Sequence, residues 1–340
     1  MAAIRPVAPK TANVATAFDV SGDEAQHRLD GILRARLSLS WGAARELVKR
    51  GKVTVDGARA TAHDAKVAIG AHVEVNPTAR RSDGVAIADS AIVYHDPHIV
   101  VANKPAGIST IPWEAGERGT LEELVRFWLV RRANHPPHAT LGVVHRIDKE
   151  TSGLVIFART FAAKKALSQA FRVHALERRY VAIVHGVLSS KATFRSYLVE
   201  DRGDGLRGAA RDPRIGERTG QLAITHVAPI AVLSRDASGD GATAVACALE
   251  TGRTHQIRIH LSEARMPIVG DRVYTRDRLR TEKELILAPR SMLHAMVLAF
   301  EHPITGKPLR FTVPLPPDIV KVGSRLMGAH FDVDASKLPL

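Results

Sequence analysis

Cysteine, long apolar runs and acidic residues are all scarce in this chain of 340 residues. The single cysteine, Cys247, excludes internal disulfides and thiolate metal clusters, and its apolar neighbours indicate a buried core residue. No run of about 18 apolar residues occurs, so we expect no membrane span. Prolines and acidic residues interrupt residues 1–26 where a signal peptide needs an apolar core, which favours a cytoplasmic protein.

Sequence motifs for common cofactors are also missing. The chain has no Walker phosphate loop, no Gly-x-Ser-x-Gly segment and no His-Glu-x-x-His segment. Residues 203–208 have the glycine spacing of a dinucleotide fingerprint, but no buried strand precedes them and no apolar helix follows. His255 and His260 are interpreted as strand or loop residues rather than metal ligands. We therefore expect no metal and no nucleotide cofactor.

The charge of the chain is strongly basic. Its 48 lysines and arginines exceed its 35 acidic residues, which gives a formal net charge of +13 and a pI near 10.2. A charge of this size attracts polyanions. Nucleic acid is the leading partner, and an anionic membrane surface is a weaker alternative because no long amphipathic basic helix occurs.

The length and the changes in composition predict two domains with flexible ends. We expect a flexible tail at residues 1–26, a small domain at 27–78, a turn-rich linker at 79–85, a large domain at 86–320 and a C-terminal tail at 321–340. No function can be assigned to the C-terminal tail, and we expect a monomer.

We expect the small domain to consist of two helices followed by strands. Apolar residues from Leu29 onwards share one helical face, and Ser40 can cap a second helix that ends at Gly51. Residues 52–57 alternate and reach an Asp-Gly hairpin turn, and residues 67–75 also alternate. Arg45, Lys49 and Lys52 are spaced to share one side. They indicate either a phosphate-binding face or an ordinary solvated one.

The large domain mixes strands with a few helices. Strands are expected at residues 91–94, 99–102, 154–158, 180–184 and 243–249, and Thr120 and Thr160 can each cap a helix. Residues 201–220 are rich in Gly, Arg and Asp and are expected to form a loop. Without repeated βαβ spacing, this order predicts an α+β domain with a largely antiparallel mixed sheet flanked by helices.

The most informative segment runs from Val144 to Phe157. It places Asp148 between Arg146 and Lys149, before a Thr-Ser-Gly turn and an apolar strand. A carboxylate on a loop fixed by a sheet is well held for catalysis. The spacing alone favours an aspartate in a surface turn with nearby salt bridges.

The complete segment resembles the catalytic motif of the RluA/RluD-type RNA pseudouridine synthases. That motif is His-Arg-Leu-Asp-x-x-Thr-Ser-Gly, and Ile147 is the only departure. The resemblance implies that Asp148 is the catalytic residue. It also implies that Arg146 occupies the space that the target uridine leaves when it is extruded from the RNA.

Three further segments resemble the same family. In residues 178–186, Tyr180 takes the place of the tyrosine that packs against the target uracil. In residues 250–260, Arg258 takes the place of the arginine that pairs with the catalytic aspartate, and Arg253 and His255 belong to the same signature. The third match covers residues 266–274, 293–295 and 302–303. The resemblance implies catalytic roles for Asp148, Tyr180 and Arg258.

Pseudouridine formation suits these residue types. The N-glycosidic bond breaks, the uracil turns, and its carbon 5 joins the ribose, which needs a carboxylate as nucleophile or base. A nearby arginine favours the ionised carboxylate, and a tyrosine offers a flat apolar face. The target base must leave its stack. Whether Asp148 acts first as nucleophile or as base stays open.

Residues 27–76 resemble the small RNA-binding domain named after ribosomal protein S-four. Trp41 and Gly42 depart from it, because that family often has polar residues there. The resemblance implies that basic residues grip the RNA backbone, and the candidates are Arg28, Arg45, Lys49, Arg50 and Lys52.

The sequence therefore predicts an RNA pseudouridine synthase that acts on specific uridines, with large-subunit ribosomal RNA as the favoured substrate. A transfer-RNA synthase and a non-catalytic RNA-binding ribosome assembly factor remain the alternatives. The assembly factor would predict loss of Asp148, Tyr180 or Arg258, and all three are present. A hydrolase that uses Asp148 with a histidine would need a metal cluster or a water-activating base, for which no convincing spacing occurs.

Overall fold

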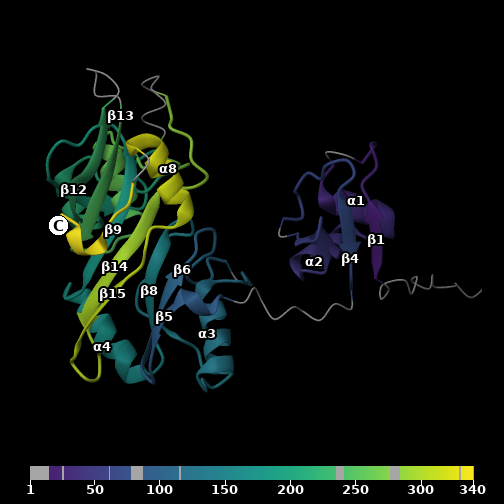
Figure 1. Ribbon diagram of the computed structural model, residues 1–340, viewed down its shortest axis with the longest axis horizontal. Coiled ribbons are helices and arrows are strands. Elements are labelled where there is room, and N and C mark those ends of the chain that lie inside the picture. Colours follow the sequence, from purple (N-terminus) through teal and green to yellow (C-terminus); the bar gives the residue numbers. More distant parts are fainter. Residues whose placement is uncertain are drawn as a thin grey trace, which may run out of the picture. The chain divides into compact units, whose positions relative to one another are not determined.

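The computed structural model of the protein divides into two compact units, Met1–Ala86 and Ile87–Leu340 (Figure 1). It describes residues 15–24, 27–60, 62–77, 87–114, 116–234, 241–275, 284–328 and 331–339. The predicted linker at residues 79–85 lies outside these ranges. Within them, no helix is long and apolar enough to cross a membrane.

In its described residues, the smaller unit contains two helices and a four-stranded antiparallel sheet of order β1-β4-β2-β3. Its elements are β1 (Thr16–Asp19), α1 (Leu29–Leu37), α2 (Trp41–Lys49), β2 (Val53–Val55), β3 (Ala58–Arg59) and β4 (His72–Val75). Leu29, Ile32 and Leu33 are buried in its core, so the predicted helical face is confirmed.

Local sequence signals set the boundaries of these elements. The Ser40 side chain accepts a hydrogen bond from the Ala43 N–H, which caps α2, and Gly51 ends the helix with a positive φ. Asp56 and Gly57 both have positive φ, as the tight turn between β2 and β3 requires. The predicted helix cap and hairpin are confirmed.

The predicted N-terminal tail is wrong for Thr16–Asp19. These residues form β1, which pairs with β4 from Thr16 opposite Val75 to Asp19 opposite His72. The side chains of β1 are mostly exposed. A strand held by backbone hydrogen bonds at a sheet edge shows no burial pattern in its sequence, so nothing in the pattern predicted it.

The larger unit is built on an 11-stranded sheet of order β11-β10-β12-β13-β9-β14-β8-β6-β5, with β15 beside β14 and β7 beside β8. Among the strand pairs of the described ranges, only β14 with β8 is parallel. The strands are β5 (Ile92–His95), β6 (Ile99–Lys104), β7 (Gly142–Val143), β8 (Ser152–Ala158), β9 (Glu177–His185), β10 (Ala192–Val199), β11 (Gly208–Ala209), β12 (Gln221–Ser234), β13 (Gly241–Leu249), β14 (Leu293–Glu301) and β15 (Pro308–Thr312).

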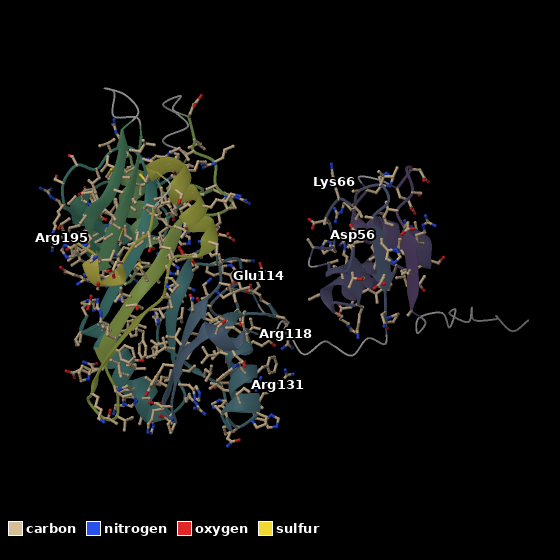
Figure 2. The ribbon with its side chains drawn as sticks, viewed as in Figure 1. Asp56, Lys66, Glu114, Arg118, Arg131 and Arg195 are labelled. Atoms are coloured by element: carbon tan, nitrogen blue, oxygen red, sulfur yellow. The ribbon has the colours of Figure 1, made fainter. Side chains whose placement is uncertain are left out.

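Helices pack on this sheet, which confirms the α+β prediction. They are α3 (Leu121–Arg132), α4 (Phe161–Arg172), α5 (Pro213–Thr219), α6 (Gln256–Glu263) and α8 (Pro317–Met327), with short 3-10 turns at Asp89–Ala91 and Ala335–Lys337. Thr120 and Thr160 cap α3 and α4 as predicted. Charged side chains such as Asp56 and Lys66 in the smaller unit and Arg131 and Arg195 in the larger one extend outward (Figure 2).

Two predicted irregular segments are ordered instead. Residues 201–220 contain β11 and α5, because Asp212 caps a helix whose first residue is Pro213. The predicted C-terminal tail continues α8 as far as Met327, and Phe331, Val333 and Leu338 are buried in the main core. These apolar side chains pack against distant parts of the core, and the local sequence does not show that such a surface is available to them.

Candidate active site

The segment that carries Asp148 links β7 to β8. Ile147 is buried, and its backbone N–H and carbonyl both bond the hydroxyl of Thr110, at 3.2 and 2.8 Å. The Thr151 N–H donates to the Asp148 carbonyl, which closes a turn. Asp148 is therefore held by backbone contacts on both sides, while 24% of its side chain remains exposed.

Gly153 explains why the turn after Asp148 must contain glycine. Its φ is +116°, and an added Cβ would lie 2.2 Å from the carbonyl oxygen of Ala295. At this point β8 pairs in parallel with β14. Only glycine permits such a close approach of the two backbones.

Arg258 extends from α6 and contacts two carboxylates. Its Nη1 donates to Asp148 Oδ2 at 3.1 Å, and Nε and Nη2 donate to Asp271 at 2.6 and 3.1 Å. Burial opposes its ionisation, but Asp271 and then Asp148 outweigh burial and raise the pKa of the guanidinium. Arg258 is thus a permanent cation beside Asp148.

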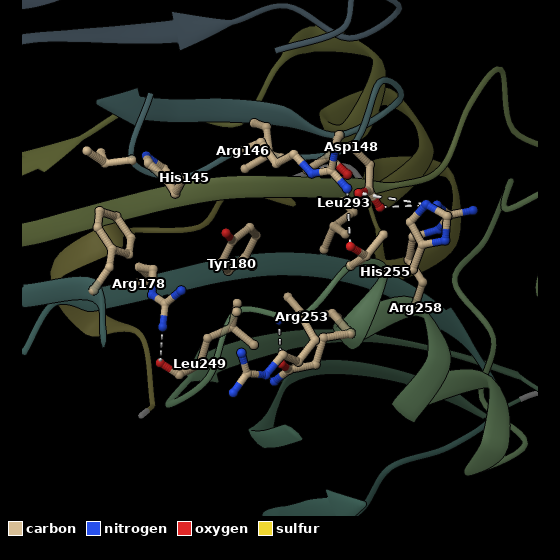
Figure 3. Close-up of a pocket in the computed structure, with 18 of the residues that line it drawn as sticks. His145, Arg146, Asp148, Arg178, Tyr180, Leu249, Arg253, His255, Arg258 and Leu293 are labelled. Atoms are coloured by element: carbon tan, nitrogen blue, oxygen red, sulfur yellow. Dashed lines mark hydrogen bonds and ion pairs between the residues drawn. The ribbon is translucent and has the colours of Figure 1, made fainter. Parts of the chain in front are cut away.

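A pocket of about 500 Å³ adjoins Asp148, within the range of small-molecule sites. Tyr180, from β9, lines this pocket and is 8% exposed. Burial raises the pKa of its phenol, so the hydroxyl is protonated at pH 7. Figure 3 shows Tyr180 in the same pocket as Asp148, Arg146 and Arg253.

The predicted residues Arg253 and His255 also line the pocket. Arg253 donates from Nε to the Leu222 carbonyl at 3.0 Å. His255 lies with Nδ1 2.9 Å from the Tyr274 hydroxyl and Nε2 3.9 Å from Asp148 Oδ1. Burial lowers the pKa of His255, although Asp148 opposes this effect. His260 was expected in a strand or loop and instead lies in α6, buried beside Thr225 and Ser196.

Arg146 lies at the surface end of the pocket lining. Its Nη2 donates to the Thr254 hydroxyl at 3.2 Å, and its guanidinium carbon is 5.7 Å from the centre of the Trp113 ring. The preceding residue, His145, stacks on Phe171, and its Nε2 accepts from the Ile156 N–H. Burial lowers the pKa of His145 to about 3, so this residue is neutral at pH 7 and serves as an anchor.

Two residues of the site were not predicted as such. Asp271 is buried and accepts from the N–H groups of Val273 and Tyr274 as well as from Arg258. Lys104 is fully buried, and its Nζ donates to the carbonyls of Pro105, Ile108 and Lys149, the residue after Asp148. The only sequence signal for Lys104 is its position as a charged residue at the end of an apolar strand. The only signal for Asp271 is its position as a charged residue after a glycine.

Two of the RNA-binding candidates of the smaller unit contact one buried carboxylate, Asp30. Arg28 and Arg45 both bond it, at 3.1 and 2.9 Å. Burial raises the pKa of Asp30, but the two arginines outweigh burial and lower it. Arg50 pairs with Glu46 at 2.7 Å. Part of the predicted basic face therefore has partners within the unit, and its binding role stays a prediction.

Comparison with known proteins adds independent findings. The RNA pseudouridylate synthase family matches residues 98–263. A ribosomal large subunit pseudouridine synthase D from Xanthomonas campestris pv. campestris is 34% identical over 319 residues, which cover 90% of this chain and 91% of the relative. The protein of that name from Pseudomonas aeruginosa is 35% identical over 286 residues, covering 80% and 83%.

Among solved structures, human RNA pseudouridylate synthase domain containing 4 is similar with a TM-score of 0.52 and 24% identity, covering 70% of this chain and 93% of that one. This likeness concerns the fold. Sequence identity above 30% across nine tenths of both chains shows that they belong to the same family. The chain belongs to the RluA/RluD-type family of RNA pseudouridine synthases and is an isomerase that converts uridine to pseudouridine in RNA.

Proposed function

We propose that this enzyme modifies specific uridines of large-subunit ribosomal RNA, with Asp148 as the catalytic carboxylate. The observation that carries the proposal is the contact between Arg258 and Asp148 at 3.1 Å beside a pocket lined by Tyr180. The names of the most similar relatives favour the ribosomal substrate.

The reaction needs no co-reactant, because the uracil loses the proton on carbon 5 and gains one on nitrogen 1. Asp148 acts as nucleophile or base when the bond from nitrogen 1 to the sugar breaks and the bond from carbon 5 forms. Arg258 places a permanent cation 3.1 Å from this carboxylate, in a pocket partly shielded from water. The Tyr180 ring supports the face of the uracil as it turns.

Arg146 supports extrusion of the target base. It is a long exposed cation beside the pocket, and its Nη2 donates a hydrogen bond to Thr254. A side chain with one such contact can move into the helical space that the uridine leaves. Unstacking a base costs a few kcal/mol, so occupancy of that space favours the extruded state.

The smaller unit is proposed to supply affinity as a ribosomal-protein-S-four-like domain. Its candidates Arg28, Arg45, Lys49, Arg50 and Lys52 would contact phosphates, while the pocket selects the uridine. Arg253 and His255 would contact the RNA at the pocket wall. We further propose that the enzyme acts in the cytoplasm, where ribosomal RNA is available, and as a monomer.

Pseudouridine mapping tests the substrate. RNA from a strain without the gene is labelled with a pseudouridine-specific reagent and sequenced, with strains that carry the wild-type or Asp148→Asn gene alongside. We expect sites in large-subunit ribosomal RNA to disappear and to return only with the wild-type gene. Sites lost only from transfer RNA would favour the transfer-RNA alternative. A full set of sites in the deleted strain would contradict the proposal and favour an assembly factor.

A further inference from the structure

Trp113 is a large aromatic residue that the larger unit exposes beside its active site. Trp113 is 75% exposed, and the guanidinium of Arg146 lies over its ring, 5.7 Å from the ring centre. Single exposed apolar residues are common on protein surfaces. Contact with a pocket-lining arginine makes this position different.

The loop that carries Trp113 is ordered by its own contacts. The backbone N–H of Trp113 donates to the Glu117 carboxylate at 2.6 Å, and Glu117 also accepts from the Ser109 hydroxyl at 2.7 Å. These bonds lower the pKa of Glu117, so it is ionised at pH 7. Thr110, in the same loop, bonds the backbone of Ile147, next to Asp148. The backbone that carries Trp113 is therefore held beside the segment of Asp148.

We propose that Trp113 stacks on an unpaired nucleobase that neighbours the target uridine. This inference rests on the proposed function, in which Arg146 moves into the RNA. When Arg146 leaves the indole, one face of the ring becomes free at the moment when the nucleotides around the extruded uridine have lost a stacking partner. An aromatic face accepts any base, and charge steers the RNA towards it.

The two events are then coupled. In the free enzyme, Arg146 bonds Thr254, and its guanidinium lies over the indole of Trp113, which is otherwise largely exposed. In the complex, a base replaces the guanidinium on the indole. Trp113 therefore favours the displacement of Arg146 from its resting place, and selects RNA in which the neighbour of the uridine is unpaired.

Tryptophan fluorescence tests the proposal directly. The probe is unmodified large-subunit ribosomal RNA transcribed in vitro, added to the full-length Asp148→Asn protein in which Trp41 and Trp128 are replaced by phenylalanine. We expect the RNA to quench Trp113, and Trp113→Ala to weaken binding about tenfold, since stacking of one base is usually worth that or more. Trp113→Phe should restore most of the affinity.

Phe161→Ala provides the matched control, because Phe161 is an exposed aromatic residue at the start of α4, 82% exposed. It should bind RNA like the wild type. Arg146→Ala should make Trp113 more accessible to acrylamide in the free protein. RNA that binds without quenching Trp113, or Trp113→Ala that binds normally, would overturn the inference alone. If the transcript is neither bound nor modified by the wild type, the proposed function fails and the inference fails with it.

Discussion

Asp271 binds two nitrogens of Arg258, Nε at 2.6 Å and Nη2 at 3.1 Å, and leaves Nη1 directed at Asp148. The Asp271 side chain is 1% exposed and is itself held by two backbone N–H groups. This bidentate contact fixes the plane of the guanidinium. The orientation of the Arg258 guanidinium beside Asp148 is therefore set by a second, buried carboxylate.

Asp148→Asn should abolish turnover while leaving RNA binding intact. The amide keeps the shape of the side chain but cannot act as nucleophile or base, so we expect a loss of roughly a thousandfold or more. Release of tritium from carbon 5 of labelled uridine measures turnover. Cys247→Ala is the control and should stay active, because burial raises the pKa of its thiol to about 12 and leaves it inert. Near-normal release by Asp148→Asn would remove the basis of the mechanism.

Arg258→Met should reduce turnover severely and should also destabilise the protein. It leaves the buried Asp271 without its cation, and breaking such a pair typically costs about 3–5 kcal/mol. The double variant Arg258→Met/Asp271→Asn should regain much of that stability, measured by urea denaturation, without regaining turnover. Activity that returns together with stability would show that Arg258 is only structural.

Lys104 should give the enzyme a pH-dependent stability. Burial lowers the pKa of Lys104 to about 7, against about 10.4 for an unfolded lysine. Between these two pKa values the unfolded chain binds more protons than the folded protein. The contribution of Lys104 to the free energy of unfolding therefore increases as pH rises. The stability of the wild type minus that of Lys104→Met should therefore increase from pH 6 to pH 9.

Urea denaturation of both proteins at the two pH values measures this difference, and Lys337→Met, at an exposed position, is the control. A difference that does not change with pH would mean that the three carbonyl contacts keep the ammonium charged throughout.

The triple variant Arg45→Ala/Lys49→Ala/Lys52→Ala should bind RNA more weakly but modify saturating RNA at a similar maximal rate. Each lost phosphate contact should reduce the log–log salt slope by about 0.7 for single-stranded contacts. Because Arg45 also pairs with Asp30 at 2.9 Å, its share should be smaller than that of Lys49. Unchanged affinity at every salt concentration would show that this face is merely solvated.

Arg146→Ala should show the opposite behaviour. Its binding to RNA should be nearly intact, while the single-turnover rate should fall strongly, because the uridine is no longer kept out of its stack. Thr254→Val, which removes only the resting contact of Arg146, is the matched control and should retain the rate. Equal losses of affinity and rate in Arg146→Ala would indicate an ordinary phosphate contact.

The sequence by itself determined the local elements and the kind of chemistry. The Ser40 and Thr160 caps and the Asp-Gly hairpin turn are decided by neighbouring residues, and each occurs where predicted. The segments that carry Asp148 and Arg258 were each recognisable in the sequence, because the backbone conformation of each short segment requires particular residues. The contact between the two could be inferred only from the family resemblance, since they lie 110 positions apart.

The tertiary structure alone decided which side chains support those segments. Nothing local shows that Asp271 orients Arg258, that Lys104 holds the carbonyl of Lys149, or that Trp113 lies under Arg146. The same holds for β1 and for the segment after α8, whose order comes from pairing and burial against distant strands. Long-range hydrogen bonds and buried contacts depend on which surfaces meet, and that is a property of the packed chain rather than of any stretch within it.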